Sequence, residues 1–460
     1  MLTASAPLQQ SLRPMVADFG AAILGPSGIP DGNGMNAPAQ EFISAQDLRR
    51  FLRERVYAEI NPTELLEIMK QDPERVRRKL IELVDQIVSE QGYLIPVNTQ
   101  AELQDYVVDE VLGYGPIDQL LRDPQVEEVM VNRLDEVWVA RRIKQRVQME
   151  KTAVCFDDQA HVMHVIDRII APIGRRVDES SPRLDARLPD GSRVNVIIPP
   201  LALDGATITI RKFPEISITI HDMIHRYNTL SPEMADFLEI CVQGRLNILI
   251  SGGTASGKTT LLNALSMFID DEERIITIED TAELRVHQHK PHVVRLESRA
   301  PNLEGKGAVT IRDLVVNSLR MRPDRIVVGE CRAEETVDML QAMNTGHDGS
   351  ITTVHANSPQ EAIHRLEIMF LMSGLKIPVV AIRQQVSMAI QLVVQVRRMR
   401  DGSRKVTSIA EVHGMGGDQV NTTEIFKLEN DKHVYTGAQL QALPKLRLSL
   451  EELPPLAVFG

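Results

Sequence analysis

One motif restricts the possible folds of this chain more than any other feature. It reads Gly252-Gly253-Thr254-Ala255-Ser256-Gly257-Lys258-Thr259, and it lies between the apolar run NILI and the helical pattern KTTLLNALSMF. Glycines at these positions let the backbone wrap around phosphate oxygens, and the helix that follows adds the positive end of its dipole. The motif therefore predicts a phosphate-binding loop between a buried strand and a helix.

The residues of this loop have different expected roles. Lys258 is suited to reach the β and γ phosphates of ATP, and the Thr259 hydroxyl is suited to ligate Mg²⁺. The other positions are expected to bind the nucleotide through backbone N–H groups. The expected nucleotide-binding residues are Gly252, Gly253, Thr254, Ala255, Ser256, Gly257, Lys258, Thr259 and Thr260.

The chain around the loop alternates between strand-like and helical patterns. Apolar runs recur at RLNILISGG, RIITIED, RIVVGE and SITTVHAN. Such alternation indicates a parallel sheet with crossover helices. Ligands bind at the carboxyl ends of parallel strands, so polar residues that end these runs are candidate site residues.

Three of these runs end in side chains that suit nucleotide hydrolysis. Glu330 follows RIVVG and is the leading candidate to position the attacking water or a metal-bound water; the position before it, commonly Asp in such enzymes, is Gly329. Glu279 ends the run ITIE and competes for the same role. His355 ends ITTVH and is a candidate sensor of the γ phosphate. The structural alternatives are helix N-caps or solvated loops for the acids and a buried, backbone-bonded histidine.

The rest of the chain differs in composition from this core. An N-terminal stretch rich in Ala, Pro and Gly is too poor in apolar residues to offset the cost of ordering. Helical periodicity follows, and then come short β-rich runs separated by turns, which favour an antiparallel sheet. The expected domains are a disordered tail (1–40), a helical bundle (41–95), an α+β domain (96–215), a linker (216–230), the ATPase domain (231–430) and a C-terminal tail (431–460).

Charge and composition exclude several functions. The net charge is −12 and aromatic residues make up 4% of the chain, so a general nucleic-acid coat is disfavoured. Three widely spaced cysteines argue against a disulfide scaffold. No run approaches the roughly 18 apolar residues that a membrane span requires, and no signal-peptide pattern is present at the start. We therefore expect a cytoplasmic protein that reaches membranes only through partners.

Four motifs together resemble a known family. GGTASGKTT, ITIEDTAEL, RMRPDRIVVGECR and TGHDGSITTVHAN are similar, in this order, to the Walker A, Asp box, Walker B and His box of type II/IV secretion ATPases. The upstream run SSPRLDARLPDGSRVNVIIPP resembles their N-terminal domain, and the resemblance covers about residues 100–420. The similarity is greatest to tight-adherence (Tad) pilus assembly ATPases, which also have an extra helical region. Gly329-Glu330 matches the family's Walker B.

This resemblance implies a RecA-like parallel-sheet core preceded by a PAS-like α+β domain and a small helical bundle. It also implies a homohexameric motor that hydrolyses ATP with Mg²⁺ at the cytoplasmic side of the inner membrane, together with pilus platform proteins. Similar proteins direct N-terminal arginines at the γ phosphate, and Arg187, Arg193 and Arg211 fall in the matching segment. Surface or interface salt bridges are the alternative for each of them. Arg320, Arg322 and Arg332, which flank the Walker B run, are further candidates.

Two other classes of protein remain open from the sequence. A nucleic-acid translocase would use a related ATPase core, although the acidity of this chain counts against it. An assembly scaffold would bind ATP without turning it over. A small-molecule kinase is disfavoured because no lid or acceptor site is apparent.

Overall fold

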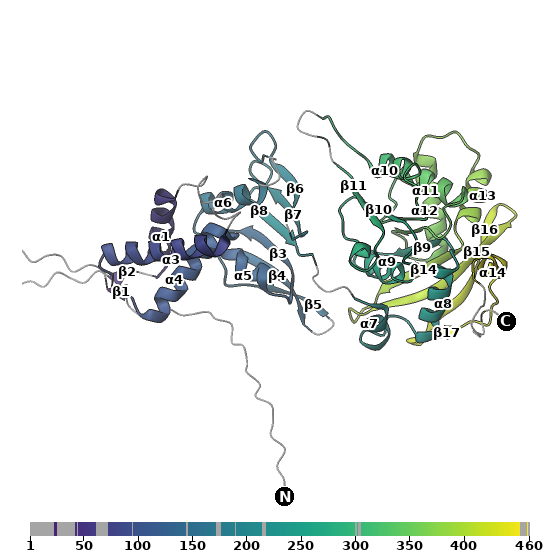
Figure 1. Ribbon diagram of the computed structural model, residues 1–460, viewed down its shortest axis with the longest axis horizontal. Coiled ribbons are helices and arrows are strands. Elements are labelled where there is room, and N and C mark those ends of the chain that lie inside the picture. The colour runs from purple at the N-terminus through teal and green to yellow at the C-terminus, as the bar shows by residue number, and fades with distance from the viewer. Residues whose placement is uncertain are drawn as a thin grey trace, which may run out of the picture. The chain divides into compact units, whose positions relative to one another are not determined.

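The computed structural model describes residues 23–24, 42–43, 45–60, 72–93, 95–143, 146–171, 176–188, 190–213, 218–299, 301, 305–450 and 458. The chain divides into two compact units (Figure 1). The N-terminal unit comprises residues up to 142 together with 148–213, and the C-terminal unit comprises 143–147 together with residues from 214 onward. Of the predicted tail 1–40, only β1 (Ile23–Leu24) is described, and it pairs antiparallel with β2 (Phe42–Ile43). The rest of that prediction lies outside the described residues.

Three helices form the first part of the N-terminal unit: α1 (Ala45–Glu59), α3 (Pro73–Glu90) and α4 (Val97–Leu112). The start of α3 follows from its sequence, because the Asp72 side chain accepts the N–H of Arg75 and a proline occupies the first turn. Leu48, Val84 and Leu103, one from each helix, share a buried core. Helix α4 therefore packs with the helical bundle, whereas the sequence placed it in the α+β domain.

The second part of the N-terminal unit is a six-stranded sheet in the order β5-β4-β3-β8-β7-β6. Helix α6 packs on it through Val162, Val165 and Ile169. The paired strands that the structure resolves run antiparallel, as expected from the short β-rich runs. The elements are η1 (Gly115–Ile117), α5 (Asp118–Arg122), β3 (Val126–Arg133), β4 (Glu136–Ile143), β5 (Arg146–Lys151), α6 (Gln159–Ile170), β6 (Arg183–Arg187), β7 (Arg193–Ile197) and β8 (Thr207–Arg211).

A buried polar junction ties the helical bundle to this sheet domain. Nε2 of His161 on α6 lies 2.9 Å from Oε1 of Glu110 on α4, and both side chains are buried. Arg53 of α1 donates to Asp157 at 2.5 Å. Buried charged groups are stable only when each has a hydrogen-bonding or oppositely charged partner. The junction therefore favours one packing arrangement of the helical bundle against the sheet domain.

The C-terminal unit is built on a nine-stranded sheet in the order β11-β10-β12-β13-β9-β14-β15-β16-β17. Strands β11 to β14 are parallel, and β14 to β17 are antiparallel. The sheet is therefore mixed: the pairings between β11 and β14 are parallel, as expected, whereas β15, β16 and β17 add an antiparallel part that was not predicted. The strands are β9 (Ile248–Gly252), β10 (Ile275–Glu279), β11 (Val293–Glu297), β12 (Arg325–Val328), β13 (Ile351–Val354), β14 (Leu392–Arg398), β15 (Arg404–Gly416), β16 (Gln419–Glu429) and β17 (Lys432–Tyr435).

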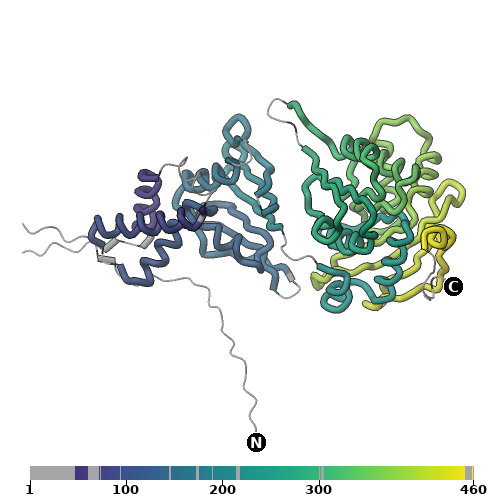
Figure 2. Tube along the Cα trace, in the orientation of Figure 1, coloured from purple at the N-terminus to yellow at the C-terminus, as the bar shows by residue number. Residues whose placement is uncertain are grey.

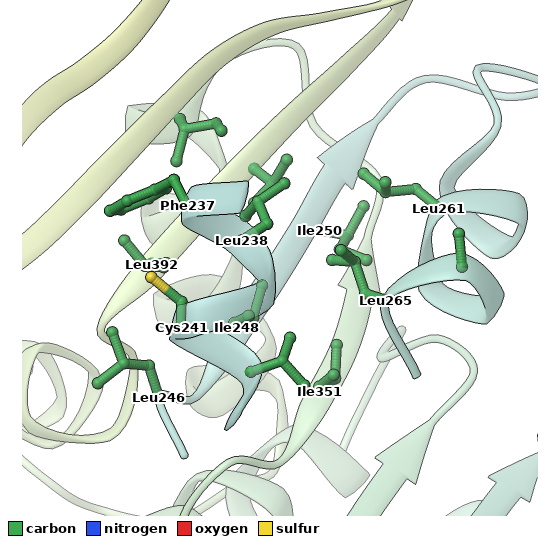
Figure 3. Packing of buried hydrophobic residues seen from close by; sticks show 14 of the residues in the cluster. Phe237, Leu238, Cys241, Leu246, Ile248, Ile250, Leu261, Leu265, Ile351 and Leu392 are labelled. Carbon is green, nitrogen blue, oxygen red and sulfur yellow. The ribbon is translucent and has the colours of Figure 1, made fainter. Parts of the chain in front are cut away.

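Buried side chains form two apolar clusters in this unit. Figure 3 shows part of one cluster, in which Phe237 and Leu238 of α8 pack near Ile248 and Ile250 of β9 and Leu265 of α9. The other cluster contains residues of α10 to α13. The helices are α7 (Ile220–His225), α8 (Pro232–Gln243), α9 (Lys258–Ser266), η3 (Val286–Gln288), α10 (Ile311–Ser318), α11 (Glu335–Asn344), α12 (Pro359–Met372), α13 (Val379–Ala389) and α14 (Leu443–Ser449).

The predicted boundaries of the ATPase domain (231–430) differ from those in the structure. Residues 218–230, predicted as part of a linker, contain α7, and Met223 and Leu230 are buried in the core of the unit. Strand β17 extends the sheet beyond residue 430, and Leu446 of α14 is fully buried in the same core. Figure 2 shows this C-terminal segment in yellow, folded onto the unit. Apolar burial thus makes both segments part of the domain.

None of the helices in the described part of the chain combines the length and apolarity needed to span a bilayer.

Candidate nucleotide site

The glycine-rich segment forms a tight loop between β9 and α9. Every residue of β9 is buried, and α9 begins at Lys258 directly after Gly257. Gly257 has φ +98° and Ala255 has φ +55°, so the backbone turns twice through the left-handed region. A methyl group on Gly252 would lie 2.5 Å from both Oγ of Ser256 and the carbonyl oxygen of Val396. Only glycine fits at position 252, and the loop is therefore held against β14.

Lys258 points back into this loop. Its Nζ donates to the carbonyl oxygens of Gly252 and Gly253, each at 3.2 Å. The same Nζ lies 3.4 Å from both ring nitrogens of His355. Burial lowers the pKa of Lys258, and the nearby Glu330 carboxylate opposes that shift. The ammonium group is thus held beside the loop, where it could bind a phosphate.

Glu330 lies between two basic side chains. Its Oε1 is 2.9 Å from Nε2 of His355, and its Oε2 accepts a hydrogen bond from Nη2 of Arg332 at 2.8 Å. Burial and then the positive charge of Lys258 lower the pKa of His355, which favours the neutral imidazole. The hydrogen bond to Glu330 raises the pKa of Arg332. Lys258, His355 and Glu330 therefore form one connected polar group.

An open pocket lies over this group. Its lining residues are Thr254, Glu330, Cys331, Arg332, His355 and Arg365. Arg365 comes from α12, and sequence reasoning did not single it out because it belongs to none of the glycine- or strand-associated motifs. Only the packing of α12 places its side chain at the pocket.

Glu279 ends β10, the strand beside β12. Its side chain is 4% exposed, and its Oε1 accepts the backbone N–H groups of Glu283 at 2.8 Å and Leu284 at 2.9 Å. Burial raises its pKa to about 7, and the two N–H groups limit the shift. A buried carboxyl group with a pKa near neutrality is suited to exchange a proton.

The expected magnesium ligand lies on the first turn of α9. Thr259 and Thr260 follow Lys258 there, and both are half-buried. A hydroxyl at the first turn of this helix suits the hard oxygen donors that Mg²⁺ prefers. Within the described residues no cluster of His, Cys, Asp and Glu forms a metal site made of protein side chains alone. A magnesium ion here would therefore take nucleotide and water oxygens as well.

Comparisons with known proteins identify the family. The family model described as "Type II/IV secretion system protein" matches residues 110–433 of the chain. The chain belongs to the type II/IV secretion system ATPase family.

Relatives of this secretion ATPase include proteins from several organisms. A putative conjugal transfer protein of Mycobacterium tuberculosis is 36% identical over 307 residues, which cover 65% of this chain and 85% of the relative. The type IV secretion system protein VirB11 of Brucella abortus is 32% identical over 313 residues, which cover 63% of this chain and 85% of the relative. The VirB11 ATPase from Brucella suis, known from a crystal structure, is 32% identical to this chain in sequence. The matched region covers 64% of this chain and 92% of the VirB11 chain, with a TM-score of 0.35.

Three predicted arginines of the secretion ATPase lie side by side on the sheet of the N-terminal unit. Arg187 of β6 is directly opposite Arg193 of β7, and Arg193 is directly opposite Arg211 of β8. Directly opposed residues of antiparallel strands share one face of the sheet. Arg187 also donates to the carbonyl oxygen of Gly191 at 3.3 Å, and Arg211 lies 3.5 Å from Glu128. The row belongs to the N-terminal unit and the glycine-rich loop to the C-terminal unit.

The three arginines that flank the Walker B run lie at different ends of β12. Arg320 and Arg322 precede the strand and so lie at its amino end, whereas Arg332 follows its carboxyl end and contacts Glu330. The loop also lies at the carboxyl ends of the parallel strands. The fold therefore brings only Arg332 of these three to the pocket.

Proposed function

We propose that this secretion ATPase is a Mg²⁺-dependent motor that hydrolyses ATP to power assembly of a tight-adherence pilus or a related secretion machine. The observation that carries the proposal is the convergence of Lys258, His355 and Glu330 beside the glycine-rich loop, at the carboxyl ends of three neighbouring strands. Membership of the type II/IV secretion family supports the same reaction.

In this proposal each residue has a defined task. The N–H groups of residues 252–260 and the ammonium group of Lys258 bind the phosphates. Thr259 would hold Mg²⁺, which neutralises charge on the β and γ phosphates when bound. Glu330 positions the attacking water or a metal-bound water, and neutral His355 beside it senses the γ phosphate by hydrogen bonding.

Glu279 is the second candidate for the proton acceptor. Its raised pKa favours it as a base at neutral pH, whereas Glu330 is engaged by His355 and Arg332. The variants Glu330→Gln and Glu279→Gln separate the two roles. Replacing the residue that accepts the proton should remove the acidic limb from the pH profile of kcat. Replacing the other residue should leave that limb in place.

The row formed by Arg187, Arg193 and Arg211 is proposed to stabilise charge on the γ phosphate from a domain or subunit boundary. Guanidinium groups in adjacent register repel one another, and an anion relieves that repulsion through bidentate hydrogen bonds. The proposal includes a homohexamer, inner-membrane pilus platform proteins as partners and no nucleic-acid partner. It places the protein in the cytoplasm, peripheral at the inner membrane through these partners.

The test is multiple-turnover phosphate release by the purified full chain with ATP and Mg²⁺. Lys258→Ala and Glu330→Gln should each lower the steady-state rate by about a hundredfold or more and leave a residual rate. Lys432→Ala, which replaces an exposed lysine on β17, should keep the wild-type rate. Wild-type rates in Lys258→Ala or Glu330→Gln would overturn these assignments. Stimulation by DNA would favour a translocase, and absence of turnover in the wild type would favour a nucleotide-binding scaffold.

A further inference from the structure

The turn between β14 and β15 lies beside the glycine-rich loop. Val396 of β14 pairs in parallel with Gly252, the last residue of β9. Two residues later, Arg398 of β14 pairs with Arg404, the first residue of β15. The register of the sheet therefore brings Arg404, which is distant from Gly252 in the sequence, next to the loop.

The Arg404 side chain follows the loop through two kinds of contact. Its Nε donates a hydrogen bond to the carbonyl oxygen of Ala255 at 3.3 Å. Its methylene groups pass Gly257, where a methyl group would lie 3.6 Å from Cδ and 3.9 Å from Cγ of Arg404. The side chain thus covers the two positions at which the backbone enters the left-handed region.

The contact with Ala255 determines how one loop N–H is directed. Ala255 has φ +55°, a left-handed conformation that is unfavourable for an L-residue without compensation. A trans peptide unit is planar, so the carbonyl of Ala255 and the N–H of Ser256 point in opposite directions. When Arg404 holds the carbonyl of Ala255 on its own side, the Ser256 N–H is turned to the side away from Arg404.

We propose that Arg404 is a positioning residue that preorganises the loop for anion binding, so that the β14–β15 turn contributes to nucleotide affinity. The inference rests on the proposed nucleotide binding. A donor that orients the loop before binding reduces the ordering cost that the ligand would otherwise bear. Arg404 acts through the backbone of Ala255, and its charge is secondary.

Two substitutions separate geometry from charge. Arg404→Met keeps the apolar stem and removes the donor, while Arg404→Lys keeps the charge but has a methylene group at the position of Nε. We expect both variants to bind Mg·ADP about threefold to tenfold more weakly than the wild type, the effect of one lost hydrogen bond. Arg398→Met, an exposed residue at the paired position, should bind normally.

The measurement is titration of the full chain with a fluorescent ADP analogue in the presence of Mg²⁺, alongside thermal unfolding without nucleotide. Arg404→Ala provides a second readout, because added methylguanidinium should restore part of the affinity if the missing donor is the cause. Wild-type affinity in Arg404→Met or Arg404→Lys, or an affinity of Arg404→Ala that methylguanidinium does not change, would overturn the inference. If the wild-type chain itself binds no ADP, the proposed function is wrong and this inference fails with it.

Discussion

A methyl group on Gly329 would lie 3.0 Å from Cγ of Glu279. Glu279 ends β10, Gly329 follows the neighbouring strand β12, and the buried Glu279 side chain fills the space next to the Gly329 backbone. This contact gives a physical reason for glycine at the position before Glu330. An aspartate there would need the volume that Glu279 already occupies.

This contact predicts the effect of Gly329→Ala. We expect it to lower the free energy of unfolding by about 1–3 kcal/mol, because the buried Glu279 side chain has to move. Urea unfolding measures the change, and Gly253→Ala, whose methyl group would meet nothing within 4 Å, is the matched control. In a Glu279→Ala background the cost should fall by at least about 0.5 kcal/mol. Equal costs in both backgrounds would show that the two side chains are not coupled.

The raised pKa of Glu279 predicts a pH dependence of stability. Burial raises this pKa from 4.5 to about 7, so between these values the folded chain holds a proton that the unfolded chain has released. Stability is therefore lost as pH rises from about 4.5 to about 7 and stays level above that, by at most about 3 kcal/mol.

Urea unfolding of the wild type and Glu279→Gln at pH 5 and pH 8 tests this expectation. Glu279→Gln lacks the titrating group, so the difference in unfolding free energy between the two proteins should change in favour of the variant as pH rises. A difference that stays constant with pH would contradict the raised pKa.

The contact between His355 and Glu330 predicts a defect in turnover. His355→Ala removes the neighbour 2.9 Å from Oε1 of Glu330 and leaves the lysine contacts with the loop carbonyls in place. We expect kcat to fall by about tenfold or more, with a smaller change in KM, because an orienting partner is lost. His364→Ala, an exposed histidine on α12, should leave both constants unchanged. A rise in KM alone would assign His355 to nucleotide binding instead.

Two glycines of the motif TGHDGS should differ sharply in their tolerance of alanine. A methyl group on Gly349 would lie 1.7 Å from Nη1 of Arg325, whereas one on Gly346 would meet nothing within 4 Å. Arg325 is fully buried, and it bonds both carboxylate oxygens of Glu273, at 2.6 and 2.8 Å.

We therefore expect Gly349→Ala to cost about 3 kcal/mol or more, because it displaces a buried charge pair. Gly346→Ala should cost about 1–2 kcal/mol, the strain of its positive φ of 99° alone. Urea titration measures the free energy of unfolding of both variants. Equal losses would mean that Arg325 relocates without cost.

Local features were the most predictable from the sequence. The strand, loop and helix around Lys258 follow from residues adjacent in the chain, and so does the start of α3 at Asp72-Pro73. The ends of the ATPase unit were less predictable. Helix α7 and strand β17 become part of the domain only because distant side chains bury Met223, Leu230 and Leu446.

The candidate site also combines features that are local in the sequence with contacts that depend on the tertiary structure. The sequence by itself determined which chemistry is available: a glycine-rich loop with Lys258, acids at the ends of two apolar runs and a histidine at the end of a third. Only the tertiary structure decided which of these groups meet, because strand order and register depend on pairings between distant segments. It placed His355 against Glu330, Glu279 against Gly329, and Arg404 against Ala255. No local pattern encodes such contacts, since each exists only once the sheet has formed.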